Sequence, residues 1–191
     1  MMFTDTAAHT MLDALDIAYA ALHAAYPGAD GADAELSGGN YARRPVALQA
    51  ASARARTLSA PVTFEVPSGA TVAWLSWRKA DGSCVAVTPL GGEAPRAAIT
   101  DPATDIVTCE NHGFADGYTV VFSGEPPAGL QTGVIYHVRD VAGDTFRVAA
   151  AAGGAAVDIT ADGVARVTRI VPEIYNNAGT YQLTGAVLAL E

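Results

Sequence analysis

The sequence is poor in aromatic and in basic residues. Half of its 191 residues fall in the hydrophobic class, but aromatic side chains make up only 7% and 40 residues are alanine, so any core is built largely from small side chains. Lysine and arginine together number 11 against 20 acidic residues, which leaves a net charge of −9. Because neutralising phosphates requires clustered cations, we expect no nucleic-acid partner.

Long apolar runs and cysteine are also scarce. Gly, Pro, Asn or Asp interrupts every apolar stretch well before the ~20 residues that cross a bilayer, so we expect no membrane insertion. Met1 to Ala8 lacks the basic start of a secretory signal. A chain of this length can build a core without disulfides, so a bond between Cys84 and Cys109 is neither required nor excluded, and we expect two small buried thiols.

The histidines and cysteines lack the spacing that metal chemistry needs. Cys109 and His112 form a single Cys-x-x-His, and no second pair completes the four ligands of a structural zinc site. The Asn111-His112-Gly113 segment is explained without zinc, as a turn between strands. We therefore expect no metal site and no cofactor.

Catalytic motifs are absent as well. The sequence contains no nucleophile elbow, no Walker-type loop and no dinucleotide-binding glycine pattern after a strand. One group of carboxylates could in principle hold calcium, but it lacks the spacing of a calcium loop and is better explained as a solvated acidic loop region. Its members are Asp101, Asp105, Glu110 and Asp116. We expect no catalytic residues, and a structural or binding protein rather than an enzyme.

The pattern of apolar residues predicts a short N-terminal helix followed by strands. Helix signals begin at Asp5 or Thr6, while Ala18 to Ala25 fits either the end of that helix or a strand. Asp81-Gly82 indicates a hairpin, and Thr71 to Trp77 is apolar on both faces, as a central strand of a β-sandwich would be. The strands expected in this half are Val46 to Ala50, Val62 to Val66, Thr71 to Trp77 and Ser83 to Thr88.

The second half has the rhythm of a separate small β-module. Leu90 to Arg96 resembles a junction, and turn signals recur after it at roughly the 8–12-residue spacing of an all-β module. Tyr181 to Leu190 then reads as one long closing strand. The strands expected in the module are Asp105 to Glu110, Tyr118 to Ser123, Gly133 to Arg139, Thr145 to Ala150, Ala155 to Ile159 and Val164 to Ile170.

Several of these segments together resemble a family of small tailed-bacteriophage virion proteins, usually called tail fibre or minor tail proteins. The family pattern is a short helix, a strand ending in Leu-His, a Pro-Gly turn and Gly-Gly-x-Tyr-Ala-Arg, which Leu22-His23, Pro27-Gly28 and Gly38 to Arg43 match. Arg44 departs from the commoner glutamine. Later matches are Val62 to Phe64, Val72 to Trp77 and Asn177 to Gly179. The resemblance implies a helix ending near Asp16 and a strand from Ala18.

In that family the strand at Ser83 to Thr88 would run almost directly into the closing strand. The intervening segment resembles another β-module of phage tail proteins, through Asn111 to Gly124, Tyr136 to Val138 and Asp144 to Phe146. We therefore expect a mainly β protein in which a β-sandwich host domain with a short N-terminal helix is interrupted by an inserted all-β module. The expected host domain is 1–90 plus 171–191, and the module is 91–170.

The resemblance implies a non-enzymatic component of a tailed-phage virion, in the tail, fibre, baseplate or neck, with the module binding other virion proteins or a host-surface receptor. A capsid decoration protein is the alternative, and an enzyme acting on glycans through Asp101, Asp105 or Asp116 is a third. A thin core favours a homo-oligomer, and we expect a trimer. Candidate partner-binding residues are Tyr41, Arg43 and Arg44; alternatively, one arginine pairs within the chain and the other is solvated.

Overall fold

The computed structural model describes residues 4–91 and 93–189, which form a mainly β protein with a short N-terminal helix. The chain divides into two compact units: unit 1 is Met1–Leu90 with Pro172–Glu191, and unit 2 is Gly91–Val171. The elements of unit 1 are α1 (Asp5–Asp13), β1 (Tyr19–His23), β2 (Arg44–Pro45), β3 (Ala55–Thr57), β4 (Val62–Val66), β5 (Ala70–Val72), β6 (Trp74–Arg78), β7 (Cys84–Pro89), β14 (Glu173–Tyr175), β15 (Gly179–Leu183) and β16 (Val187–Ala189).

The N-terminal segment forms a helix and then a strand. The hydroxyl of Thr4 accepts a hydrogen bond from the amide of Ala7 at 3.3 Å and caps α1, which buries Ala8 and Leu12. The helix ends at Asp13, and Asp16 has a positive φ of 50° just before β1. The reading of 18–25 as a continuation of the helix is therefore wrong, and the strand reading is confirmed.

A four-stranded antiparallel sheet, in the order β2-β1-β6-β7, is the centre of unit 1. All five residues of β6 are buried, so both faces of the sheet are covered. The predicted hairpin connects β6 to β7, and Gly82 supplies the positive φ of 88° that its turn requires. β2 and β7 are the edges of the sheet.

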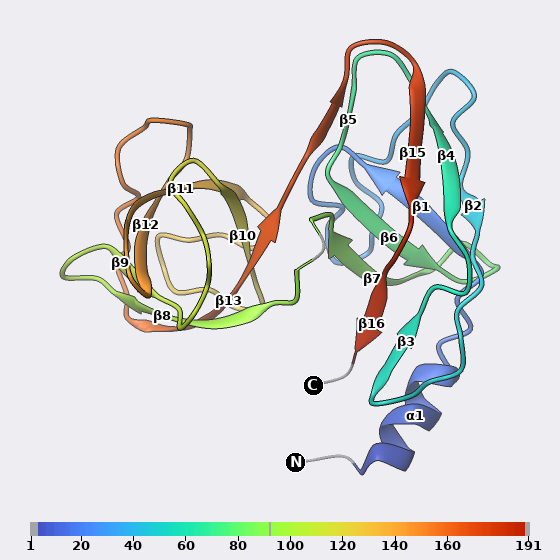
Figure 1. The fold of residues 1–191 in the computed structure, drawn as a ribbon, viewed down its shortest axis with the longest axis horizontal. Coiled ribbons are helices and arrows are strands. Elements are labelled where there is room, and N and C mark those ends of the chain that lie inside the picture. The colour runs from blue at the N-terminus through green and yellow to red at the C-terminus, as the bar shows by residue number, and fades with distance from the viewer. Residues whose placement is uncertain (1–3, 92, 190–191) are drawn as a thin grey trace. The chain divides into compact units, whose positions relative to one another are not determined.

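A two-stranded antiparallel ribbon forms the second layer of unit 1. The ribbon has three ladders, β5–β14, β4–β15 and β3–β16, whose registers agree to within one residue. Val72 faces Glu173, Phe64 faces Tyr181 and Ala55 faces Ala189. The C-terminal segment thus retraces the path of 55–72 in reverse, as the red and green strands of Figure 1 show. Both layers contribute to one core: Ala20, Leu22, Leu36, Phe64, Val66, Val72, Leu75, Trp77, Leu90 and Leu183.

Three predicted strands of unit 1 need correction. The predicted strand 71–77 is two strands that break at Ala73, because β5 pairs with the ribbon strand β14 while β6 pairs with β1 and β7. The predicted closing strand is also divided, into β15 and β16, and its last predicted residue, Leu190, lies outside the described residues. Within the predicted strand Val46 to Ala50 only an isolated bridge forms, between Leu48 and Leu58.

Unit 2 is a closed six-stranded antiparallel barrel in the order β10-β11-β12-β9-β8-β13. Every strand has two hydrogen-bonded neighbours, so the barrel leaves none of its strands as an edge. Its core contains four buried aromatic rings, from Phe114, Phe122, Tyr136 and Phe146. The strands are β8 (Arg96–Asp101), β9 (Ile106–Thr108), β10 (Thr119–Ser123), β11 (Ile135–Ala142), β12 (Thr145–Ala149) and β13 (Gly163–Ile170).

Two features of the barrel differ from the sequence-based expectation. The segment interpreted as a junction includes the start of β8, a strand that the sequence analysis missed and that pairs with both β9 and β13. The predicted strand Ala155 to Ile159 is irregular apart from a single bridge between Ala149 and Ala156. The buried side chain of Ile159 still belongs to the barrel core.

The chain leaves and re-enters unit 1 at one place in its backbone. The amide of Leu90 donates to the carbonyl of Ala73 at 2.9 Å, and Glu173 pairs with the preceding residue, Val72. The residues before and after unit 2 are therefore held on either side of Ala73. Unit 2 spans Gly91–Val171, and the module expected from the sequence is 91–170.

Candidate functional site

Two of the three predicted partner-binding residues, Tyr41 and Arg43, are tied to Glu35 and β1. Arg43 donates two hydrogen bonds to the Glu35 carboxylate, from Nε at 2.9 Å and from a terminal nitrogen at 2.8 Å. The hydroxyl of Tyr41 accepts from the Leu22 amide at 2.9 Å. Burial opposes ionisation of Glu35, but the hydrogen bonds and charge of Arg43, with the charge of Arg78, outweigh it and lower the pKa of the carboxyl.

Tyr41 is held in its neutral form. Burial of its ring, reinforced by the negative charge of Glu35, raises the pKa of the phenol to about 12. The hydroxyl therefore keeps its proton at neutral pH and joins the loop to β1 through hydrogen bonds. Tyr41 and Arg43 thus already serve an internal contact, which agrees with the alternative that one arginine pairs within the chain.

A second polar network lies on the face of the sheet opposite the apolar core. Arg78 of β6, 5% exposed, donates from Nε to Ser76 Oγ at 3.1 Å, and its other nitrogens reach the carbonyls of Gly31 and Gly82. It also lies 3.6 Å from the Glu35 carboxylate. This one guanidinium therefore joins the loop 24–43 to the β6–β7 hairpin.

His23 completes this network and its tautomer follows from its partners. Nδ1 lies 2.7 Å from the carbonyl of Asp33, which can only accept, so Nδ1 carries the proton. Nε2 then accepts from the hydroxyl of Ser76, 2.8 Å away. Burial disfavours the charged ring and is the main cause that lowers the pKa of His23. Since His23 and Ser76 are both fully buried, this Ser–His pair cannot meet a substrate and instead fixes the loop.

Arg44, the third predicted residue, is placed differently from its neighbour Arg43. It lies on the edge strand β2 opposite Ala20, whose side chain belongs to the apolar core. Its side chain is half-buried, and Nε is buried without a hydrogen-bond partner. No ion pair or hydrogen bond joins the Arg44 side chain to any residue in 4–91 or 93–189. The sequence analysis grouped Arg43 and Arg44 because they are adjacent in the chain. Only the pairing of β1 with β2 shows that their side chains have different surroundings.

Three of the four acidic residues singled out in the barrel support its turns and loops. Asp101 accepts from the Ala103 amide at 2.9 Å, and Asp105 accepts from Ile159 at 2.9 Å. Asp116 accepts from the amide of Val141 at 3.0 Å. Each carboxylate thus binds a different backbone amide, and the described residues contain no group of three or more His, Cys, Asp or Glu side chains able to hold a metal ion.

Cys109 and His112 are part of the barrel core. The amide of Phe114 donates to His112 Nδ1 at 2.8 Å, and the imidazole packs against the rings of Phe114 and Phe146 with centroids 4.9 and 5.1 Å away. Cys109 is 1% exposed, and burial raises the pKa of its thiol. Both cysteines are free; burial is confirmed for Cys109, whereas Cys84 is only half-buried.

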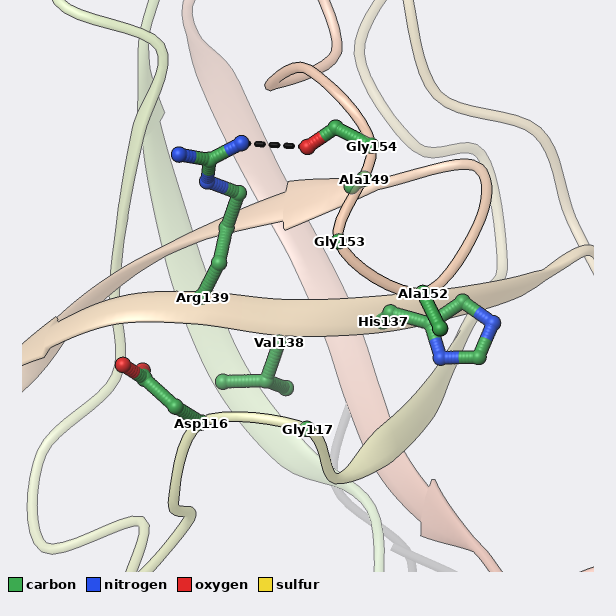
Figure 2. A pocket seen from close by; sticks show the side chains of 9 residues that line it. All are labelled: Asp116, Gly117, His137, Val138, Arg139, Ala149, Ala152, Gly153 and Gly154. Atoms are coloured by element: carbon green, nitrogen blue, oxygen red, sulfur yellow. Dashed lines mark hydrogen bonds between the residues drawn. The ribbon is translucent and has the colours of Figure 1, made fainter.

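A shallow hollow of about 250 Å³ lies on the outer surface of the barrel (Figure 2). His137 and Arg139 alternate along β11 with Val138, whose side chain belongs to the core. Arg139 donates to the carbonyl of Gly154 and lies 3.0 Å from Asp140, so this guanidinium holds the adjoining turn. The lining residues are Asp116, Gly117, His137, Val138, Arg139, Ala149, Ala152, Gly153 and Gly154.

The sequence analysis considered the histidines only as metal ligands and did not find the hollow. The available signals were two turns, Asp116-Gly117 and Gly153-Gly154, whose approach to β11 depends on the closure of the barrel. The hollow offers polar groups and small side chains, and its lining contains no phenylalanine, tyrosine or tryptophan.

Comparison with known proteins finds no match. No family model, no curated protein and no solved structure is similar to this chain. Among the described residues, no helix is long and apolar enough to span a membrane.

Proposed function

We propose that this chain is a non-enzymatic structural component of a tailed-phage virion, in which unit 1 is the carrier and the barrel is a binding module that faces outward. The proposal rests on the backbone pairing on either side of Ala73. Leu90 and Glu173 are both held beside this residue, so the two ends of the segment that forms the barrel lie close together. An insertion of this kind is tolerated where the two ends of the inserted segment lie close together.

The polar networks of unit 1 support a structural role. Arg78, His23 and Tyr41 fix the loop 24–43 to the sheet through buried or half-buried hydrogen bonds. The full burial of Ser76 and His23 favours positioning over catalysis. A rigid loop and a sheet with open edges suit a protein that assembles with neighbours, and we propose a homo-oligomer, with a trimer as the first candidate.

The partners in this proposal are copies of the chain, other virion proteins and a host-surface receptor for the barrel. Capsid decoration is the alternative, because a carrier with open edges and a projecting barrel would suit the head as well as the tail. The two proposals differ only in where the protein lies on the particle.

Labelling of particles tests the proposal. Antibodies raised separately against unit 1 and unit 2 are coupled to gold and applied to virions purified from the bacterial culture that produces the protein. We expect the unit 2 antibody to label intact particles at the tail, and the unit 1 antibody to label mainly after the particles are disrupted. Label on the head would support the decoration alternative, and a protein found only in the particle-free fraction would refute both.

A further inference from the structure

Four arginines of unit 1 have a carboxylate partner, and Arg44 has none among residues 4–91 and 93–189. Arg43 and Arg78 share Glu35. Arg56 pairs with Asp13 at 3.5 Å, and Arg54 with Asp5 at 3.3 Å. The chain carries nearly twice as many acidic as basic residues, so an arginine without a carboxylate is not explained by a shortage of acids.

The placement of Arg44 fixes the direction of its side chain. Ala20, its partner across the β1–β2 ladder, is fully buried in the apolar core, and side chains of facing residues lie on the same side of a sheet. The stem of Arg44 therefore starts on the core side at the outermost strand of the sheet. With Nε buried and the residue only half-buried, the charged end reaches solvent at the sheet margin.

A guanidinium in this position is ready for an external acceptor. The terminal nitrogens of Arg44 have no acceptor among the described residues, and a hydrogen bond between two charged groups is stronger than one between neutral groups. The planar fork of arginine matches the two oxygens of a carboxylate, and the packed stem reduces the side-chain freedom that binding would otherwise remove. A carboxylate from outside the chain is the group that best fits this site.

We propose that Arg44 anchors an interface between copies of this chain by binding a carboxylate of the neighbouring copy. The inference rests on the homo-oligomer of the proposed function and names the residue that holds it together. Each copy brings an excess of acidic residues to its neighbour, which is the complement that Arg44 lacks. The next facing pair on this edge, Tyr19 (38% exposed) and Pro45, lies on the opposite face of the sheet from Arg44.

The geometry of such a contact also fits a ring. If Arg44 and the carboxylate that it binds lie on different surfaces of the chain, the contact is head-to-tail and joins two unlike patches. Repeated contacts of this kind close into a ring when the rotation between copies allows it, and a trimer is one such ring. Because β2 has only two residues, the contact depends on its side chains more than on its backbone.

Sedimentation of the full chain tests the proposal with matched arginine variants. Wild type is compared with Arg44→Gln, Arg44→Lys, Arg43→Gln and Arg96→Gln at several protein and salt concentrations. Arg96→Gln removes the same charge from an exposed position in the barrel. We expect wild type to associate, Arg44→Gln to weaken association roughly tenfold or more, and Arg44→Lys to have an intermediate effect. Arg96→Gln should associate as wild type does.

Arg43→Gln distinguishes an effect on association from an effect on folding stability. It breaks the pair with Glu35 and should lower the stability of unit 1, measured by tryptophan fluorescence, while association of the folded protein is retained. A monomeric wild type, equal association of Arg44→Gln and wild type, or equal weakening by Arg96→Gln would each overturn the proposal. If particles are labelled but Arg44→Gln associates as wild type does, only the Arg44 interface is refuted. If association depends on Arg44 but particles are not labelled, only the virion location is refuted.

Discussion

The two units differ in whether their sheets have edge strands. In unit 2 the sheet closes on itself, so every strand has two neighbours. In unit 1 the four-stranded sheet has β2 and β7 as edges, and the ribbon consists of strand pairs. An open edge is a template for pairing with another chain, whereas a closed barrel has none. The barrel therefore offers no strand edge to another chain, whereas the sheet of unit 1 has two edge strands.

The two units also differ in the side chains that fill their interiors. The barrel core brings four aromatic rings together, with edge-to-face contacts such as Phe114–Phe146 at 5.5 Å. Unit 1 combines an apolar core on one face of its sheet with hydrogen bonds through His23, Ser76 and Arg78 on the other. Both units contain side-chain hydrogen bonds, but in unit 1 a connected network through His23, Ser76 and Arg78 is buried under one face of the sheet.

The largest expected effect is a loss of stability in the barrel core that leaves the core of unit 1 unchanged. Phe146→Ala removes a ring that is 1% exposed and should destabilise unit 2 by about 3–5 kcal/mol. Both tryptophans, Trp74 and Trp77, lie in unit 1, so urea unfolding followed by tryptophan fluorescence reports that unit alone. We expect the fluorescence transition to stay in place while circular dichroism detects earlier unfolding. Phe64→Ala is the matched control and should shift the fluorescence transition; a shift with Phe146→Ala would show that the units unfold together.

The next effect concerns the polar face of unit 1. Arg78→Met keeps much of the side-chain volume but leaves Ser76 and the carbonyls of Gly31 and Gly82 without their donor, at a cost of about 3 kcal/mol. The fluorescence transition should move to lower urea and the circular dichroism of the barrel should not. A neutral result would mean that this network does not hold the loop 24–43.

A smaller effect is expected at Tyr41. Tyr41→Phe keeps the ring and removes the hydroxyl that accepts from the Leu22 amide, so unit 1 should lose about 1 kcal/mol of stability. The same fluorescence assay measures it. Tyr19→Phe, at an exposed position of the same strand as Leu22, serves as the control and should change little. Equal losses in both variants would remove Tyr41 from the set of residues that position the loop.

The smallest effect is a pH dependence confined to unit 1. Burial holds the pKa of His23 below its ordinary value of 6.5, so between the two values the unfolded chain binds a proton that the folded chain does not. The stability of unit 1 should therefore fall as the pH is lowered through 6.5 and level off below the folded pKa. Urea unfolding at about pH 7.5 and about pH 5.5 measures the difference, and His23→Gln should abolish it. A pH dependence that persists in that variant would assign it to other groups.

Local features of the fold were predictable from the sequence. Val62 to Val66 was predicted as a strand and is one, because its alternating apolar residues are bounded by Pro61 and Pro67. The hairpin at Asp81-Gly82 follows from a glycine that the turn requires. The mainly β class with a short N-terminal helix was confirmed on the same grounds.

Features that depend on distant partners were not predictable. Nothing at Ala73 marks a strand break, which arises because the residues on its two sides join different sheets. The different roles of Arg43 and Arg44 depend on Glu35 and Ala20, which the fold places beside them. The sequence could name these arginines as candidates, but only long-range pairing shows which of them has a partner.

Dissection of the chain tests the contrast between the units most directly. One fragment is Gly91–Val171 alone; the other is unit 1 with that segment replaced by a short glycine-serine linker, which the closeness of Leu90 and Glu173 to Ala73 permits. Sedimentation and circular dichroism should show a folded, monomeric barrel and a unit 1 that associates as the full chain does. A barrel that is unfolded alone, or that associates while unit 1 remains monomeric, would contradict the account.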